Sequence, residues 1–189
     1  MKLLFGSKKL QLLSACLPVV IAMGCGSAST NSTNTASTAK NTTASTASGD
    51  NVAVVKALYK AYNERDTANI GSLYANNYVE YGDGTYPAKT YPAPDSLVIE
   101  FKEQLKIVPD AHTGNEEYFT GDSDKVIVVS TNTGTWTGAA VKGQKATGKS
   151  FKYDDADIYT LKDGKITAHK NIYPSKAIGA QVGFIYANR

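Results

Sequence analysis

Apolar and aromatic residues recur every three or four positions just after residue 50, which is the spacing of one face of a helix. This pattern predicts a helix from Asn51 to about Arg65, with an apolar face made by Val52, Val55, Leu58, Tyr59 and Tyr62. A short second helix is expected after Asp66, whose side chain suits an N-cap. A third helix is expected to begin at a cap on Asp95 and to stop before Pro109.

The second half of the chain is rich in the residues that favour strands. Runs of Val, Ile, Thr and aromatic residues predict strands at 111–120, 125–136, 150–161 and 166–173, after a short strand at 78–81. Lys162-Asp163-Gly164-Lys165 is typical of a hairpin turn. Helices first and strands afterwards predict an α+β domain, with the helices packed on one face of a curved, mainly antiparallel sheet.

The first 25 residues have a different pattern. Three lysines precede an apolar stretch at 10–23, which is shorter than the roughly 20 residues that a membrane span needs and suits a secretory signal. Ile21-Ala22-Met23-Gly24-Cys25 resembles a bacterial lipobox, whose Cys is lipidated and becomes the new N-terminus. We prefer it to a similar run ending at Cys16, because the apolar stretch continues past that residue. An ordinary signal peptide is the alternative.

Residues 26–50 are almost entirely Ser, Thr, Ala and Asn, a composition that cannot form a core and predicts a disordered tether. The expected organisation is therefore a signal peptide at 1–25, a tether at 26–50 and one domain at 51–189. We expect the protein at the cell envelope, touching the bilayer only through the Cys25 anchor. In a Gram-negative source, Gly26 after Cys25 favours the periplasmic face of the outer membrane.

The charge of the domain argues against a nucleic-acid partner. The whole chain carries a net charge of +3, but from residue 51 onward 16 basic residues face 16 acidic ones. A nucleic-acid binder would be expected to have a basic surplus. Both cysteines lie in the leader, so the domain has no cysteine for a disulfide, a metal site or a nucleophile.

Candidate acid/base residues come from two strands. Asp155 and Asp157 alternate with apolar neighbours, so both point to the same side as Tyr153 and Tyr159. If that side is enclosed, the repulsion between the two carboxylates would raise the pKa of one of them and make it a plausible acid/base group. If they instead face solvent or a dimer interface, they have no catalytic role. His112 and His169 are the only histidines, on strands that could be neighbours. Their spacing gives no chelating pair, so we expect no metal.

Longer runs resemble a known family. Leu58-Tyr59-x-Ala61-Tyr62-Asn63-x-x-Asp66, with Leu73-Tyr74-Ala75, resembles the opening of the NTF2-like superfamily, the cone-shaped fold of ketosteroid isomerase and scytalone dehydratase. Later runs resemble its SnoaL-like polyketide cyclase (ester cyclase) branch: Val108-Pro109-Asp110-Ala111-His112, Gly134-Thr135-Trp136-Thr137-Gly138, Ala146-Thr147-Gly148-Lys149, Asp157-Ile158-Tyr159, Asp163-Gly164-Lys165-Ile166 and Gln181-Val182-Gly183. They follow the family's order and cover nearly the whole domain.

The resemblance implies an acid/base pair near the last strand, which in such cyclases is thought to close a ring in a polyketide ester. The family's His falls on His169, but the position of its catalytic Asp falls on Pro174, which cannot move protons. Comparison with ketosteroid isomerase places the neutral oxyanion-stabilising Asp on Asp157 and the general base at Gly82. The resemblance thus implies only part of a catalytic site.

Two functions therefore stay open. The domain binds a small hydrophobic molecule in its cone without established catalysis, or it is a cyclase or isomerase that uses His169 and Asp157 on a polyketide-like carbonyl compound. The expected pocket residues are Tyr59, Tyr81, His112, Trp136, Asp155 and Tyr173, with Tyr81 as an orienting donor. No cofactor is expected. The resemblance also implies a homodimer through the open face of the sheet, which a monomeric sedimentation mass would contradict.

Overall fold

A computed structural model describes residues 44–84, 87–122 and 124–185. The order of helices and strands in the described chain is α1 (Ala44–Glu64), α2 (Thr67–Leu73), β1 (Tyr74–Gly82), β2 (Lys89–Tyr91), α3 (Pro94–Ile107), β3 (His112–Thr120), β4 (Lys125–Thr135), β5 (Ser150–Lys162), β6 (Lys165–Ile172) and α4 (Ser175–Gln181). This is the predicted α+β class, with helices first and most strands after.

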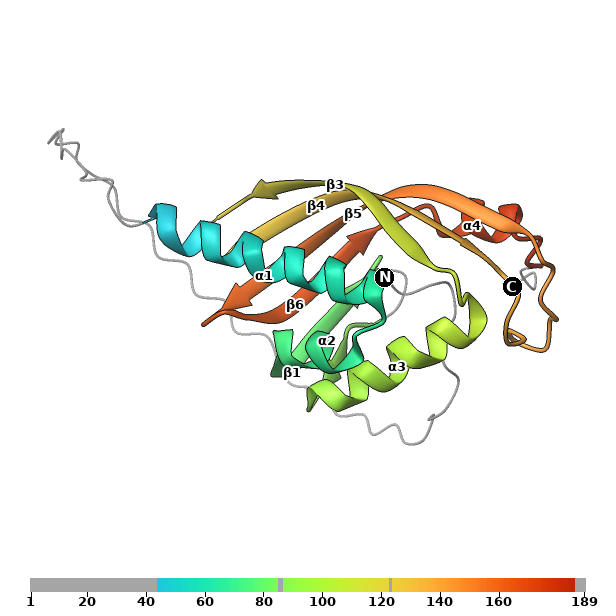
Figure 1. Ribbon diagram of the computed structural model, residues 1–189, viewed down its shortest axis with the longest axis horizontal. Coiled ribbons are helices and arrows are strands. Elements are labelled where there is room, and N and C mark those ends of the chain that lie inside the picture. The colour runs from blue at the N-terminus through green and yellow to red at the C-terminus, as the bar shows by residue number, and fades with distance from the viewer. Residues whose placement is uncertain (1–43, 85–86, 123, 186–189) are drawn as a thin grey trace, which may run out of the picture. The chain divides into compact units, whose positions relative to one another are not determined.

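The strands form one curved sheet in the order β2-β1-β6-β5-β4-β3 (Figure 1). Strand β1 pairs with β6 in parallel, and every other pairing is antiparallel. The long strands β4 and β5 alternate buried and exposed residues, as expected when one face of a sheet is covered. The parallel pairing joins the first strand of the domain to the last and sets Glu80 beside His169.

Helices α1, α2 and α3 lie on one side of the sheet, which curves over them (Figure 1). The apolar face of α1 is buried through Val55, Leu58 and Tyr59, within the larger of two hydrophobic clusters. The smaller cluster gathers Trp136, Phe151 and Tyr153 with residues of α4 and the chain after it. The cone that the family resemblance predicts therefore has its wide interior between the sheet and α1 to α3.

Several element predictions need correction. Helix α1 begins at Ala44, seven residues before the predicted start and inside the segment expected to be a tether. The N-cap of α3 is Ala93, because Pro94 already occupies the first turn and Asp95 follows within it. Strand β2 and helix α4 were not predicted at all. Strands β3 and β6 are separated by β4 and β5, so His112 and His169 do not lie on neighbouring strands.

The predicted signal peptide, Cys25 and most of the tether lie outside the described residues, so these stay predictions. Within the described part of the chain, no helix is both long enough and apolar enough to cross a bilayer.

Candidate active site

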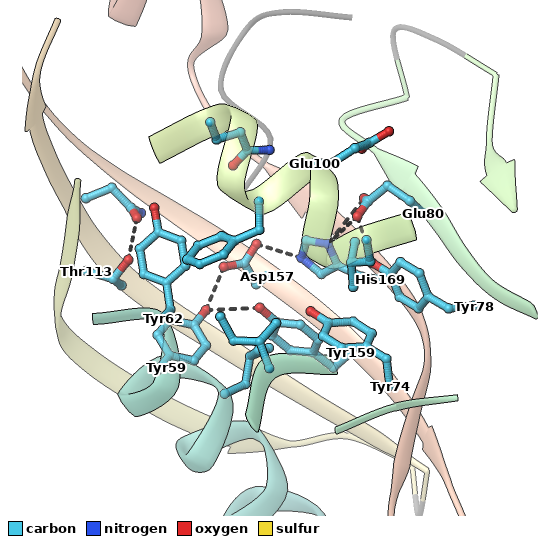
Figure 2. Close-up of a pocket in the computed structure, with 16 residues that line it drawn as sticks. Tyr59, Tyr62, Tyr74, Tyr78, Glu80, Glu100, Thr113, Asp157, Tyr159 and His169 are labelled. Atoms are coloured by element: carbon cyan, nitrogen blue, oxygen red, sulfur yellow. Dashed lines mark hydrogen bonds and ion pairs between the residues drawn. The ribbon is translucent and has the colours of Figure 1, made fainter. Parts of the chain in front are cut away.

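A small cavity of about 70 Å³ lies between α1, α3 and the concave face of the sheet (Figure 2). Most of its wall is aromatic or apolar, with Tyr59 and Tyr62 from α1, Phe101 from α3 and Tyr159 from β5 among the lining residues. Three ionisable groups interrupt this wall on the sheet side: Glu80 from β1, His169 from β6 and Asp157 from β5. Apolar enclosure with a few convergent polar groups is typical of a small-molecule site.

His169 is held between two carboxylates (Figure 2). Its Nδ1 lies 3.1 Å from Glu80 Oε2, and its Nε2 lies 2.8 Å from Asp157 Oδ1. The three side chains are at most 8% exposed. The imidazole ring also stacks on Tyr159, with ring centroids 4.6 Å apart. Both ring nitrogens thus have an acceptor and one ring face has an aromatic cover, which fixes the orientation of His169.

The strand pairings explain why these three side chains meet. Glu80 and His169 are direct neighbours across the parallel β1–β6 pair. His169 lies opposite Tyr159 across the antiparallel β5–β6 pair, and Asp157 is two residues from Tyr159 on the same face of β5. The imidazole of His169 therefore has the Glu80 carboxylate on its β1 side and the Asp157 carboxylate on its β5 side.

Hydroxyl groups continue this network into the cavity. The Tyr59 hydroxyl donates to Asp157 Oδ2 at 2.6 Å, and the Tyr159 hydroxyl donates to Tyr59 at 3.5 Å. On the far side, the Tyr78 hydroxyl donates to Glu80 Oε2 at 2.7 Å and the Gly82 amide donates to Oε1 at 2.8 Å. Gly82 has a φ of +55°, a conformation suited to glycine, at the end of β1. All four carboxylate oxygens of Glu80 and Asp157 therefore accept hydrogen bonds.

The charges of the three groups stabilise one another. Burial alone would lower the pKa of His169, but the charge of Glu80 and the hydrogen bond and charge of Asp157 raise it to about 9. Burial likewise opposes ionisation of Glu80 and Asp157, yet the charge of His169 and its hydrogen bonds hold the pKa of both carboxyls below their usual range. At neutral pH the cluster is therefore two carboxylates around an imidazolium, with a net charge of −1.

A second set of buried polar side chains lies on the same face of the sheet. Ser130 donates to Asp155 Oδ1 at 2.8 Å, and Thr113 donates to Asn132 at 2.8 Å. Burial and the charge of Asp157 raise the pKa of Asp155 to about 6, although hydrogen bonding by Ser130 and Asn132 opposes this rise. The prediction that Asp155 and Asp157 share one face of the strand with Tyr153 and Tyr159 is confirmed, and the structure shows that this face is enclosed, which the sequence had left open.

The structure brings three of the predicted site residues to the cavity, namely His169, Asp157 and Tyr59. The other predicted pocket residues lie elsewhere. Tyr81 is 50% exposed and His112 is exposed, so neither can act as a pocket donor in this structure. Trp136 and Tyr173 belong to the smaller hydrophobic cluster, where they have a packing role. Asp155 is buried beside the cavity without lining it.

Glu80 is the site residue that the sequence reasoning missed. The family position for an acid falls on Pro174, which here precedes α4. The carboxylate comes instead from β1, at the far end of the domain sequence. A signal was present, because Glu80 alternates with Tyr78 in the predicted short strand and so shares its buried face. Its partner was not predictable without the parallel β1–β6 pairing.

The described residues contain no group of three or more His, Cys, Asp or Glu side chains arranged to hold a metal ion.

Residues 52–182 match the family model described as SnoaL-like polyketide cyclase. No curated protein matches the chain.

Solved structures with the same fold include a proposed polyketide cyclase from Xanthomonas campestris pv. campestris, with 16% identity, a TM-score of 0.66, and coverage of 72% of this chain and 99% of that one. A proposed SnoaL-like polyketide cyclase from Jannaschia sp. CCS1 has 15% identity, a TM-score of 0.65 and coverage of 75% and 97%. IdmH from Streptomyces antibioticus, another proposed polyketide cyclase, has 22% identity, a TM-score of 0.58 and coverage of 70% and 98%. At these identities the likeness establishes the NTF2-like fold.

Proposed function

This chain belongs to the SnoaL-like polyketide cyclase family, and on that premise we propose that its cavity binds a small hydrophobic carbonyl compound and exchanges a proton with it. The observation that carries the proposal is the buried side chain of His169, held between the carboxyl groups of Glu80 and Asp157 at the wall of an aromatic cavity. Buried charges are costly unless they are paired, and they concentrate at functional sites.

The network can both take up and return a proton. In the proposed step, the C–H bond next to the ligand carbonyl breaks, its electron pair forms the enolate, and the proton goes to Asp157. A protonated Asp157 no longer attracts the Tyr59 hydroxyl, which now donates to it at 2.6 Å, so that hydroxyl can turn to the enolate oxygen. Return of the proton to another carbon isomerises the ligand. Attack of the enolate carbon on a second carbonyl would instead close a ring, and the alkoxide formed from that carbonyl would take the proton back from Asp157.

The size of the cavity sets a condition on this proposal. A buried water needs about 10–15 Å³ of space that a water-sized sphere can enter. The cavity has about 70 Å³ of such space, which holds only a few waters. A flat ring therefore requires the wall to open. Helix α3 contributes Leu97, Glu100, Phe101 and Gln104 to that wall and lies opposite the sheet. We take α3 as the part that moves.

A second candidate function is ligand binding without turnover. All four oxygens of Glu80 and Asp157 already accept hydrogen bonds, and the lowered pKa of Asp157 makes it a weak base. In that case the same polar side chains would orient a carbonyl or hydroxyl group of the ligand by hydrogen bonds, and no proton would be transferred.

Deuterium exchange separates the two candidates. The protein for this test is residues 44–189, here called the soluble domain, which begins at the first residue of α1. We expect it to accelerate the exchange of the α-hydrogens of 2-tetralone for deuterium in D₂O, with the exchange monitored by NMR. Asp157→Asn should slow this at least a hundredfold, the usual scale of a lost acid/base group. Asp154→Asn is the matched control, because Asp154 lies on the exposed face of the same strand. No exchange above buffer would leave binding alone, and equal rates in both variants would remove Asp157 from the reaction.

We also propose that the domain is held at the cell envelope by lipid on Cys25, on the sequence pattern alone. In a bacterial host, wild-type protein should partition into the detergent phase of a Triton X-114 extract. Cys25→Ser should move it to the aqueous phase, while Cys16→Ser should leave it with the detergent. The reverse pattern would assign the anchor to Cys16.

A further inference from the structure

Two buried side-chain oxygens have no hydrogen-bond partner among the described residues, Asp155 Oδ2 and Asn171 Oδ1. The side chains are only 4% and 2% exposed. Leaving a polar atom buried and unpaired destabilises the fold, so such atoms in a native structure call for an explanation. The contrast with Glu80 and Asp157 is direct, because every oxygen of those carboxylates has a donor.

The two unpaired oxygens lie on neighbouring strands beside the proposed ligand site. Asp155 precedes Asp157 by two residues on the same face of β5, which places the two residues about 7 Å apart. Asn171 lies directly opposite Asp157 on β6. Asn132 of β4 and Asp157 of β5 both line the cavity. Two residues before Asn132 on the same face of β4 is Ser130, which lies opposite Asp155. Asp155 is thus one residue position beyond the cavity wall, on the side away from His169.

We propose that Asp155 and Asn171 form a second polar subsite, which takes a hydrogen-bond-donating group of the ligand, an amino or a hydroxyl group. The inference rests on the proposed function, in which Tyr59 and Asp157 hold the oxygen of the ligand. Both unpaired atoms are acceptors, so the matching group must donate. An amino group has two N–H donors and can satisfy both, whereas a hydroxyl group satisfies one.

The subsite narrows the ligand class. It calls for a hydrophobic ring system with an oxygen at one edge and a donor group at another, about 7 Å along the strand from the first. An aromatic side chain is available to cover such a ring, because Tyr62 of α1 lines the cavity. Asp155 receives its own fixed donor from Ser130 at Oδ1, so Oδ2 is the atom left for the ligand.

Naphthols with a varied second substituent test this subsite. The probes are 2-naphthol, 6-methoxy-2-naphthol, 2,6-dihydroxynaphthalene and 6-amino-2-naphthol, with Kd measured by calorimetry on the soluble domain at pH 7.5. We expect the amino and hydroxyl probes to bind at least tenfold more tightly than the methoxy probe, the scale of one hydrogen bond to a charged group. The amino probe should bind most tightly.

Asp155→Asn should invert this order. The Ser130 hydroxyl selects the amide oxygen at the Oδ1 position, so an NH₂ group replaces the free oxygen. The methoxy probe, which can only accept, should then bind as well as or better than the amino probe. Asn171→Leu should remove the advantage of the amino over the hydroxyl probe. Asp154→Asn should change neither, because that side chain is exposed.

The outcomes distinguish the subsite from the pocket itself. If wild-type protein binds 2-naphthol but its Kd values for the four probes agree within about threefold, the subsite is overturned and the proposed function stands. If it binds none of them, the proposed pocket fails as well. Binding of 2-naphthol by each variant, together with its thermal unfolding, shows that the variant has folded.

Discussion

At the scale of single residues, the site depends on a charge balance that no member could keep alone. An imidazolium as buried as His169 would be strongly disfavoured without its two carboxylates. Removing one partner of such a cluster typically costs about 3–5 kcal/mol, because the others stay buried and uncompensated. Since the pKa of His169 rises to about 9 on folding, its stabilising effect is fully present below its unfolded pKa of about 6.5 and is lost as the pH rises through 9.

Residue predictions succeeded where they rested on strand alternation or on a matched motif. Alternation placed Asp155 and Asp157 on one face of the strand, which the structure shows to be enclosed, and the family resemblance pointed to His169. They failed where the partner comes from a distant strand. Glu80 and His169 are 89 residues apart in the chain, and only the sheet order makes them neighbours. Tyr81 follows Glu80 directly and so points to the opposite, exposed face.

At the scale of elements, the hydrophobic pattern predicted α3 and the long strands to within a few residues, and α1 except for the seven residues at its start. It missed β2, three residues in a Pro-rich segment, and α4, a short helix whose buried residues are Ile178 and Gly179. Neither is long enough to show a clear period. The parallel pairing of β1 with β6 was not predictable from local pattern either, because it joins elements separated by most of the domain.

Helix α3 is fastened unevenly. Its last turn is tied to the loop between β4 and β5, since the amides of Gly138 and Ala139 donate to the carbonyls of Ile107 and Lys106. A Cβ on Gly138 would lie 1.9 Å from the Lys106 carbonyl oxygen, so only glycine fits this contact. The first turn has no side-chain cap, but Lys89 and Tyr91 of β2 donate to Glu100 in the middle of the helix. Opening of the cavity should therefore swing the N-terminal half of α3 about its C-terminal end and break the hydrogen bonds to Glu100.

Hydrogen exchange tests this movement. In the free domain, the amides of 98–101 should exchange faster than those of 105–107, because the N-terminal half opens more often. Saturating 2-naphthol should slow exchange across α3 and leave the central strands β4 and β5 unchanged. Gly138→Ala should speed exchange at 105–107 by breaking the tie. If all amides of α3 exchange equally slowly in the free domain and 2-naphthol does not change their rates, the helix does not move as proposed.

At the scale of the whole molecule, the order of elements and the motifs were enough to predict the NTF2-like fold, and the family match and structural neighbours confirm it. The fold explains why the site sits where it does. In the described part of the chain, helices α1 to α3 cover one face of the sheet, so polar side chains on that face are enclosed among tyrosines instead of facing water. The leader and lipid anchor rest on sequence pattern alone and stay predictions.

The central claim is that His169 is a buried imidazolium clamped by Glu80 and Asp157. Its most direct test is ¹⁵N NMR of the histidine rings across a pH titration. The chain has two histidines, so exposed His112 serves as the reference in the same spectrum. We expect both ring nitrogens of His169 to carry protons at pH 7 and to titrate near pH 9, and Glu80→Gln to lower that pKa. A His169 ring with one protonated nitrogen at pH 7, unaffected by Glu80→Gln, would contradict this account of the site.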